Sequence, residues 1–416
     1  MTLETFDPPP PPPSSTSLLD GDGTVRVLRP RRAAPGDAVR PTRAEVNLAA
    51  LRHNLRIVQK HAEGAKVWAV LKADGYGHGA PAVARTLERA GANGFCVALL
   101  EEGIELREAG IRAPILVMGG YYGAASAELV ARQLTPVVYD LSQIEAFSRL
   151  VKSGGTPGPV DVHLKIDTGM ARLGVRLNEL AAFGAKLAQT KEVNVVGLMT
   201  HLAEADALSP DEMNHQMARF DAATKQLAQL GIVPTVRHAA NSAAVLRREA
   251  RLDAVRPGVA IFGVAPVAIE KRDHESNELH LTMRVRTEIA ALREIETGEK
   301  VGYGGLWTAK RKSTIATIPM GYADGLSRAL SNCGHVLVRG KRAPIVGAVS
   351  MDMAMIDVTD HPGTSVRDEA VVLGAQEGVL GKDAISAEEV AKHAGTIPWE
   401  VLTSISRRVP RFYREP

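Results

Sequence analysis

The first feature of the sequence that could carry chemistry is a lysine at the end of an apolar run. Lys72 follows the apolar segment 67–71 and precedes the glycine-rich stretch 73–79. Apolar neighbours make an ammonium group costly to desolvate, so they lower the lysine pKa and favour the neutral, nucleophilic amine. Such an amine can form a Schiff base with a carbonyl compound. The alternative interpretation is a surface lysine in a glycine-rich turn, and Lys72 alone does not decide between the two.

Further polar residues follow other short apolar segments. They are Lys165, Asp167, Arg172, His201, Asn241, Ser242, Arg256 and Gly258. If those segments are parallel strands of one barrel, the side chains gather at its carboxyl-terminal rim and form a pocket. Gly258 and Val259 would offer backbone N–H groups to a phosphate, although a plain turn glycine is the alternative for Gly258. Together the residues point to a phosphorylated, carbonyl-bearing cofactor, which we interpret as pyridoxal phosphate (PLP).

The spacing of the predicted elements supports such a barrel. From about residue 44, short β-rich runs alternate with longer stretches rich in alanine and leucine. The predicted strands are 67–71, 95–98, 115–118, 135–139, 160–166, 193–199, 235–238 and 254–255. Eight alternating β and α units in ~220 residues match an α/β fold of the closed (β/α)8 TIM-barrel type. An open, doubly wound parallel sheet is the alternative.

The chain divides into three predicted regions. Residues 1–40 contain six consecutive prolines at 8–13 and several arginines, which predicts a disordered Pro/Arg-rich tail. Residues 41–275 are the predicted barrel. Residues 276–416 hold β-rich segments joined by glycine-containing turns, so we expect a C-terminal, mainly-β domain there.

Composition excludes several classes of function. The 50 Lys and Arg residues against 47 Asp and Glu leave a net charge of +3, too small to favour nucleic-acid binding. Cys96 and Cys333 lack metal-ligand spacing, so we expect no metal and free thiols in a reducing compartment, the cytoplasm. No apolar run reaches the ~20 residues of a membrane helix, and the first residues do not resemble an export signal.

The motifs also resemble a known family, the bacterial alanine racemases. The matching segments include AVLKADGYGHGA (69–80), LKIDTGMARLGV (164–175), HLAEAD (201–206), AANSAA (239–244), VRPGVAIFG (255–263), EKVGYGG (299–305), IPMGYADGLSR (318–328) and SMDMAMIDV (350–358). They occur in the family's order between about residue 44 and Tyr413. The resemblance implies a (β/α)8 barrel followed by a β domain, and a head-to-tail homodimer with shared active sites.

The resemblance also implies a cofactor site. Lys72 would bind PLP covalently, and Arg256 would face the pyridine nitrogen. A guanidinium with a pKa above ~12 keeps its proton, so it leaves the ring nitrogen largely unprotonated and favours racemisation over transamination. The phosphate would be held by Tyr76, Ser242, Gly258, Val259 and Tyr413.

Racemisation needs proton access from both faces of a planar carbanion. By the same resemblance, Lys72 serves one face and the phenol of Tyr303 serves the other. A free tyrosine has a pKa of ~10, so Tyr303 needs assistance, and His201 would hydrogen-bond to it and to Arg256. The product, D-alanine, would supply peptidoglycan synthesis.

Other residues are expected to bind the substrate. Arg172 would lie near the substrate carboxylate, and Lys165 would orient Arg172, with carbamylation of Lys165 as a hypothesis. Tyr322, Met351 and Asp352 would reach across the dimer toward the amino-acid substrate.

Three alternatives to an alanine racemase remain open. A racemase of the same fold could act on serine, lysine or arginine or have broad specificity, because one methylene changes discrimination by only ~1–3 kcal/mol. A barrel-type amino-acid decarboxylase shares the Schiff-base lysine but places a cysteine and an acidic residue where this chain offers Tyr303. A non-catalytic PLP carrier would not need residues 276–416.

Overall fold

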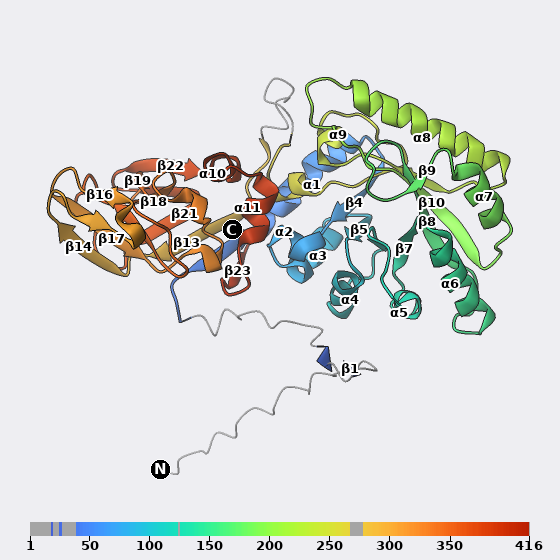
Figure 1. Cartoon of the computed structure of the whole chain (residues 1–416), viewed down its shortest axis with the longest axis horizontal. Coiled ribbons are helices and arrows are strands. Elements are labelled where there is room, and N and C mark those ends of the chain that lie inside the picture. The colour runs from blue at the N-terminus through green and yellow to red at the C-terminus, as the bar shows by residue number, and fades with distance from the viewer. Residues whose placement is uncertain (1–17, 20–24, 27–38, 124, 267–277, 416) are drawn as a thin grey trace, which may run out of the picture.

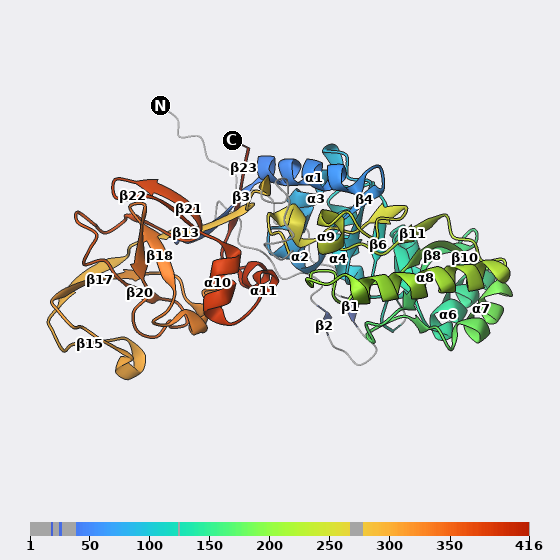
Figure 2. The same cartoon turned by 90° about the horizontal axis from the view of Figure 1, so that it is seen from above.

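The computed structural model describes residues 18–19, 25–26, 39–123, 125–266 and 278–415. Strand β1 (Leu18–Leu19) pairs with β2 (Val25–Arg26) in antiparallel fashion. Val39 and Arg40, the last residues of the predicted tail, are also described, and Arg40 pairs with Asp324. The other residues of the predicted tail and the predicted boundary at 275/276 lie outside the described residues. Figures 1 and 2 show an elongated chain with a barrel at one end and a β-rich domain at the other.

The N-terminal part is a closed parallel barrel, as predicted. Each of the eight predicted strands is present, and β12 pairs with β4 while β10 pairs with β8, which closes the ring. Alternating strands and helices thus form the predicted α/β fold. The barrel strands are β4 (Lys66–Val70), β5 (Gly94–Val97), β6 (Ile115–Val117), β7 (Thr135–Val138), β8 (Val160–Asp167), β10 (Val193–Met199), β11 (Val236–His238) and β12 (Ala254–Val255).

Helices surround the barrel, and some of them begin at a residue whose side chain accepts from a free backbone N–H group. Asn47 caps the first helix by accepting from Ala50 N, and Asp140 accepts from Ser142 N at the start of another. The short strand β9 (Val175–Arg176) extends β8. The helices are α1 (Leu48–Ala62), α3 (Ala80–Arg89), α4 (Leu100–Glu108), α5 (Ser126–Ala131), α6 (Leu141–Lys152), α7 (Leu180–Ala188), α8 (Asp211–Gln229), α9 (Ser242–Leu246) and the 3-10 turn η2 (Val259–Phe262).

The C-terminal part is mainly β, as predicted, and contains two principal sheets. Two short helices lie between these sheets and the barrel (Figure 1). The larger sheet contains β13 (Met283–Glu288), β18 (His335–Val338), β19 (Lys341–Pro344), β21 (Glu369–Gly378), β22 (Gly381–Ile385), β23 (Arg411–Arg414) and β3 (Arg43–Asn47). The smaller sheet contains β14 (Ala291–Ile295), β17 (Ser313–Ile318) and β20 (Ala354–Asp357). The two helices are α10 (Ala387–Ala394) and α11 (Pro398–Ser404).

Strand β3 lies within the predicted barrel range 41–275, but it joins the C-terminal sheet. It pairs antiparallel with β13 and parallel with β23. Its Glu45 is buried and accepts from Arg286 Nε at 2.9 Å and from an Arg414 Nη at 2.6 Å. A buried carboxylate is stable only when paired, so these arginines on β13 and β23 help to fix β3 between them.

The two domains also meet at the glycine-rich segment after Lys72. Residues Lys72–Tyr76 form the short element α2, which packs against α11. Buried Arg411 donates from Nε to the carbonyl of Gly77 at 2.9 Å. Gly77 has φ +78°, and a Cβ there would lie 2.4 Å from the carbonyl oxygen of Leu402. Only glycine therefore allows this close approach.

We predict that Gly77→Ala destabilises the protein. The change places a non-glycine residue at positive φ and forces a side chain onto the backbone of α11, which together cost about 2–5 kcal/mol. Gly64→Ala is a matched control, because Gly64 has φ +90° but a Cβ added there would meet no atom within 4 Å. Thermal unfolding should show a much larger loss for Gly77→Ala. Equal losses would mean that contact with α11 does not constrain the turn.

Candidate active site

The turn that carries Lys72 has an unusual backbone. Ala73, Asp74 and Tyr76 have φ of 51°, 58° and 52°, in the left-handed region that non-glycine residues rarely occupy. Glu102 Oε1 accepts from Ala73 N at 2.6 Å, and Asp74 Oδ1 accepts from Ala80 N at 2.8 Å. These hydrogen bonds help to hold a strained conformation at the end of β4, where barrels place their chemistry.

Lys72 itself remains accessible in the single chain. Desolvation by the surrounding protein lowers its pKa, the positive charge of Arg172 lowers it further, and Glu102 opposes both. A lowered pKa increases the share of neutral amine at physiological pH.

Three of the residues predicted to hold a phosphate, Tyr76, Ser242 and Gly258, contact one another. Ser242 Oγ accepts from Gly258 N at 2.8 Å and from Ala260 N at 3.3 Å. Buried Tyr76 places its hydroxyl against Gly258, where a Cβ would lie 2.2 Å from that oxygen. Burial raises the Tyr76 pKa, so the phenol keeps its proton as a donor. Val259 begins η2 beside Gly258, whereas Tyr413 lies on β23 at the junction of the domains.

Arg256 is fully enclosed at the end of β12. Its Nη1 donates to His238 Nδ1 at 2.5 Å, and its Nη2 donates to the carbonyls of Thr200 and Ala239. Burial lowers the guanidinium pKa to about 10, so the group stays charged at neutral pH. Its buried Nε finds no hydrogen-bond partner in the described part of the chain. A buried N–H group without a partner is free to donate to a bound acceptor.

The histidine bonded to Arg256 is His238, whereas the resemblance had implied His201. A guanidinium can only donate, so His238 Nδ1 accepts and its Nε2 carries the proton. That Nε2 lies 2.7 Å from His163 Nδ1, which extends the network. Burial lowers the pKa of His163 to about 3 and that of His238 well below its usual value, so both rings are neutral.

His163 and His238 were not among the predicted site residues. His163 lies inside β8, away from the strand ends that carried the prediction, and His238 ends β11 but has a role only through its contact with Arg256. His163 lies two residues before Lys165 on β8, so both side chains point to the same face of the strand. Polar residues at such spacing inside a predicted barrel strand were the available signal.

His201 lies on the loop after β10. Burial lowers its pKa to about 3, and the charges of Arg256 and Arg172 add to that effect. The ring is therefore neutral, and it lies close enough to both arginines for their charges to lower its pKa.

Lys165 and Arg172 occupy the predicted rim. Lys165 is buried, and burial followed by the charge of Arg172 lowers its pKa to about 8. Asp167 Oδ1 accepts from the backbone N–H groups of Gly169, Met170 and Ala171, which shapes the loop that leads to exposed Arg172.

The predicted site residues of the C-terminal domain lie apart from this rim. Tyr303 is 77% exposed in η5 (Tyr303–Gly305), within the hairpin of β15 (Lys300–Val301) and β16 (Trp307–Thr308). In Figures 1 and 2 this hairpin lies on the side of the C-terminal domain that is farthest from the barrel. A single chain therefore does not bring Tyr303 and Lys72 together.

Tyr322 and Met351 form a second exposed group in the same domain. Tyr322 begins η6 (Tyr322–Asp324), and its N–H donates to the Ser350 carbonyl at 3.0 Å, which ties that turn to segment 350–352. The adjacent carboxylate of Asp352 accepts from Arg408 at 2.6 Å. Tyr322, Met351 and Asp352 are thus brought close to one another on one surface.

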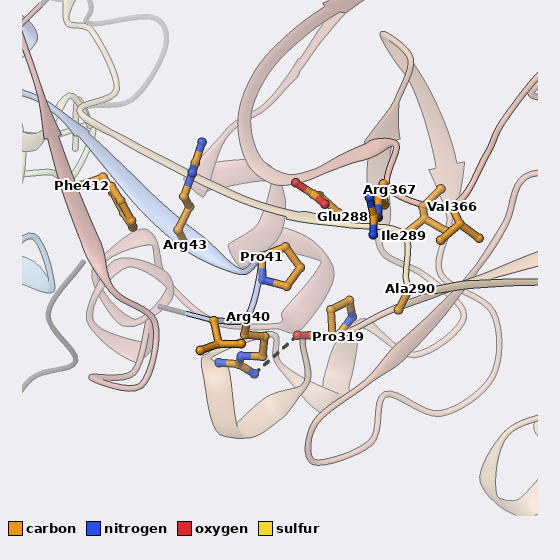
Figure 3. A pocket seen from close by; sticks show the side chains of 11 residues that line it. Arg40, Pro41, Arg43, Glu288, Ile289, Ala290, Pro319, Val366, Arg367 and Phe412 are labelled. Carbon is orange, nitrogen blue, oxygen red and sulfur yellow. Dashed lines mark hydrogen bonds between the residues drawn. The ribbon is translucent and has the colours of Figure 1, made fainter. Parts of the chain in front are cut away.

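A cavity of about 560 Å³ lies elsewhere, beside β3 and β13 in the C-terminal domain (Figure 3). Its lining includes Arg40, Arg43 and Phe412, and none of the predicted site residues. Arg40 pairs with Asp324, and Arg43 with Glu45. We therefore place the candidate active site at the barrel rim. Among the described residues, no helix combines the length and apolar character needed to cross a bilayer.

Comparison with known proteins gives a consistent result over most of the chain. The family model "Alanine racemase, N-terminal domain" matches residues 46–266, and "Alanine racemase, C-terminal domain" matches residues 282–413. The alanine racemase of Sorangium cellulosum is 60% identical over 385 residues, which cover 91% of this chain and 100% of that protein.

Solved structures agree. The alanine racemase of Bacillus anthracis with bound L-Ala-P has a TM-score of 0.83 at 33% identity, covering 91% of this chain and 96% of that one. The alanine racemase of Bartonella henselae with covalently bound pyridoxal phosphate has a TM-score of 0.79 at 30% identity, covering 90% and 99%. With both family domains matched in order and a relative of this identity aligned over its whole length, the chain belongs to the alanine racemase family.

Proposed function

We propose that this chain interconverts L-alanine and D-alanine with PLP, using Lys72 of one subunit and Tyr303 of the partner subunit as the two bases. The observation that carries the proposal is the arrangement around Lys72. Lys72, whose pKa is lowered, follows a strand of the same barrel that holds two buried groups. One is the cluster of Tyr76, Ser242 and Gly258, which could bind a phosphate. The other is Arg256, whose Nε has no hydrogen-bond partner among the described residues. The reaction would supply D-alanine for peptidoglycan.

The residues at the barrel mouth fit PLP. The Tyr76 hydroxyl, Ser242, the backbone at Gly258 and Val259, and Tyr413 would hold the phosphate. The unpaired Nε of Arg256 would donate to the ring nitrogen, and Lys72 would hold the cofactor through its amine. The covalently bound PLP of the Bartonella relative supports this assignment.

When bound, PLP supplies a conjugated ring that makes the Cα proton of an amino acid removable. Arg256 limits that effect, because a guanidinium that stays charged does not protonate the ring nitrogen. The chain thereby favours return of the proton to Cα over its transfer to the cofactor.

The chain's own groups then determine which face of Cα is protonated. Lys72 exchanges a proton on one face, and Tyr303 of the partner subunit exchanges one on the other. Arg172, with Met351 and Tyr322 from the partner subunit, would bind the substrate carboxylate and set the orientation of Cα. Neutral His201 can accept a hydrogen bond from the Tyr303 hydroxyl of the partner subunit, and so help this hydroxyl to release its proton.

We also propose a homodimer in the cytoplasm. The hairpin with Tyr303 lies far from the chain's own barrel, so a second copy would have to supply the phenol. Cys96 and Cys333 are both free, and Cys333 is exposed, which fits a reducing compartment.

The two proposed bases should have separable roles. Lys72→Ala should lose the visible absorption that borohydride bleaches in the wild type, because no amine remains to hold the cofactor. Tyr303→Phe should keep that absorption but lower kcat by about 10²–10⁴-fold. Deuterium exchange from solvent into Cα should then be blocked chiefly for one alanine enantiomer. Equal loss of exchange from both enantiomers would favour a single base that serves both faces.

Mixed dimers test the contribution of two subunits. Lys72→Ala chains and Tyr303→Phe chains are each inactive alone, but a heterodimer would contain one site with both native bases. Unfolding and refolding an equal mixture should restore activity to about a quarter of the wild-type value, because half of the randomly paired dimers carry one intact site. Absence of recovery in a mixture that has re-formed dimers would place both bases in the same chain.

Lys165 should act through Arg172. Its pKa of about 8 leaves a useful share of neutral amine, which could react with carbon dioxide to give a carbamate anion beside Arg172. We expect Lys165→Ala to lower kcat, and added chloride or acetate to restore part of it by supplying a negative charge. Unchanged activity of Lys165→Ala, with or without these anions, would show that no such anion positions Arg172.

A further inference from the structure

A second cluster of potential ligands lies in the C-terminal domain. His335 begins β18, while Glu389 and His393 lie one helical turn apart on α10. One ligand atom from each of these residues, an imidazole nitrogen or a carboxylate oxygen, lies within 4.8 Å of the other two. The fold thus brings together three donors from two separate elements.

One buried atom of the cluster has no hydrogen-bond partner among the described residues. This atom is Nδ1 of the His335 ring. Leaving a buried polar atom unsatisfied costs about 1–3 kcal/mol, so a ligand that engages the ring would recover this energy.

We propose that His335, Glu389 and His393 form a site for a divalent transition-metal ion of the zinc class. Two imidazoles and one carboxylate are a donor set that zinc accepts, with ligand bonds of about 2.0–2.2 Å. His393 is exposed, so its side chain can turn toward the ion, and water can complete the coordination. Small side-chain rotations would bring the three donor atoms to bonding distance.

Arg342 is the group that competes with such an ion. It pairs with the Glu389 carboxylate through two nitrogens, one of them 3.0 Å from Oε2. Arg342 also donates from Nε to Asp383 at 2.7 Å, so it keeps a carboxylate partner when Glu389 turns toward the metal. A hydrogen-bonded carboxylate is oriented for metal binding, although the nearby positive charge weakens the affinity.

An ion at this site would join α10 to β18. Helix α10 also packs against η7 (Arg328–Leu330), which follows the turn of Tyr322. The bound metal would therefore stabilise the part of the C-terminal domain that supports Tyr322.

The test is zinc titration of the full-length holoenzyme after removal of metals with a chelator. Calorimetry should show one Zn²⁺ per chain, lost or weakened at least ~10-fold by His393→Ala and by His335→Gln. His215→Ala is the matched control, because His215 and Glu212 form an exposed His–Glu pair on α8. That variant should bind Zn²⁺ as the wild type does.

Melting curves in the absence of metal check that the variants fold. His393 is exposed, so His393→Ala should unfold at the wild-type temperature without metal and should lose the rise in Tm that Zn²⁺ gives the wild type. If the wild type binds no Zn²⁺, or if the His393→Ala and His335→Gln variants bind it as tightly as the wild type, the proposal is wrong.

Discussion

The site depends on the strained turn that follows Lys72. Three non-glycine residues there occupy the left-handed region, which isolated peptides avoid. Contacts from both domains hold the turn in this conformation. Within the barrel, Glu102 accepts from Ala73 N. From the C-terminal domain, α11 packs closely against Gly77, and Arg411 donates to the Gly77 carbonyl. The backbone that orients Lys72 and Tyr76 is therefore stabilised jointly by both domains. Strand β3 also links them, because it belongs to the C-terminal sheet and leads directly into α1 of the barrel.

Charge is the second constraint. Lys72, Lys165, Arg172 and Arg256 lie close enough that the arginines lower the pKa of the lysines and of His201. The two carboxylates that oppose this field, Glu102 and Asp167, are also engaged by backbone N–H groups. A pocket with this excess of positive charge is suited to an anionic ligand, because an anion relieves the mutual repulsion of the cations. Phosphate and carboxylate groups meet that requirement.

The sequence was informative where local pattern determines structure. Buried parallel strands read as short apolar runs, so the eight strands of the barrel and the polar residues at their ends could be predicted. Strand β3 could not, because its partners β13 and β23 lie hundreds of residues away and the pairing of Glu45 with their arginines has no local signature. The left-handed turn was equally hidden, since an alanine such as Ala73 has no intrinsic preference for positive φ. His238 was overlooked because its role depends on Arg256, which a different strand supplies.

The distribution of exposed apolar side chains completes the physical picture. Tyr303, Leu306, Tyr322, Met351 and Met353 are each 43% exposed or more, and all belong to the C-terminal domain. Water-exposed apolar groups of this size are unfavourable in a monomer when they gather, and their burial in an interface is favourable. The same domain carries the proposed second base, while the barrel rim carries Lys72 and Arg172 open to solvent. If these two surfaces of different copies pack together, the apolar groups are buried and water is excluded from Lys72 in one step. The free energy gained by burying the apolar side chains would then drive both the assembly of the dimer and the completion of the site.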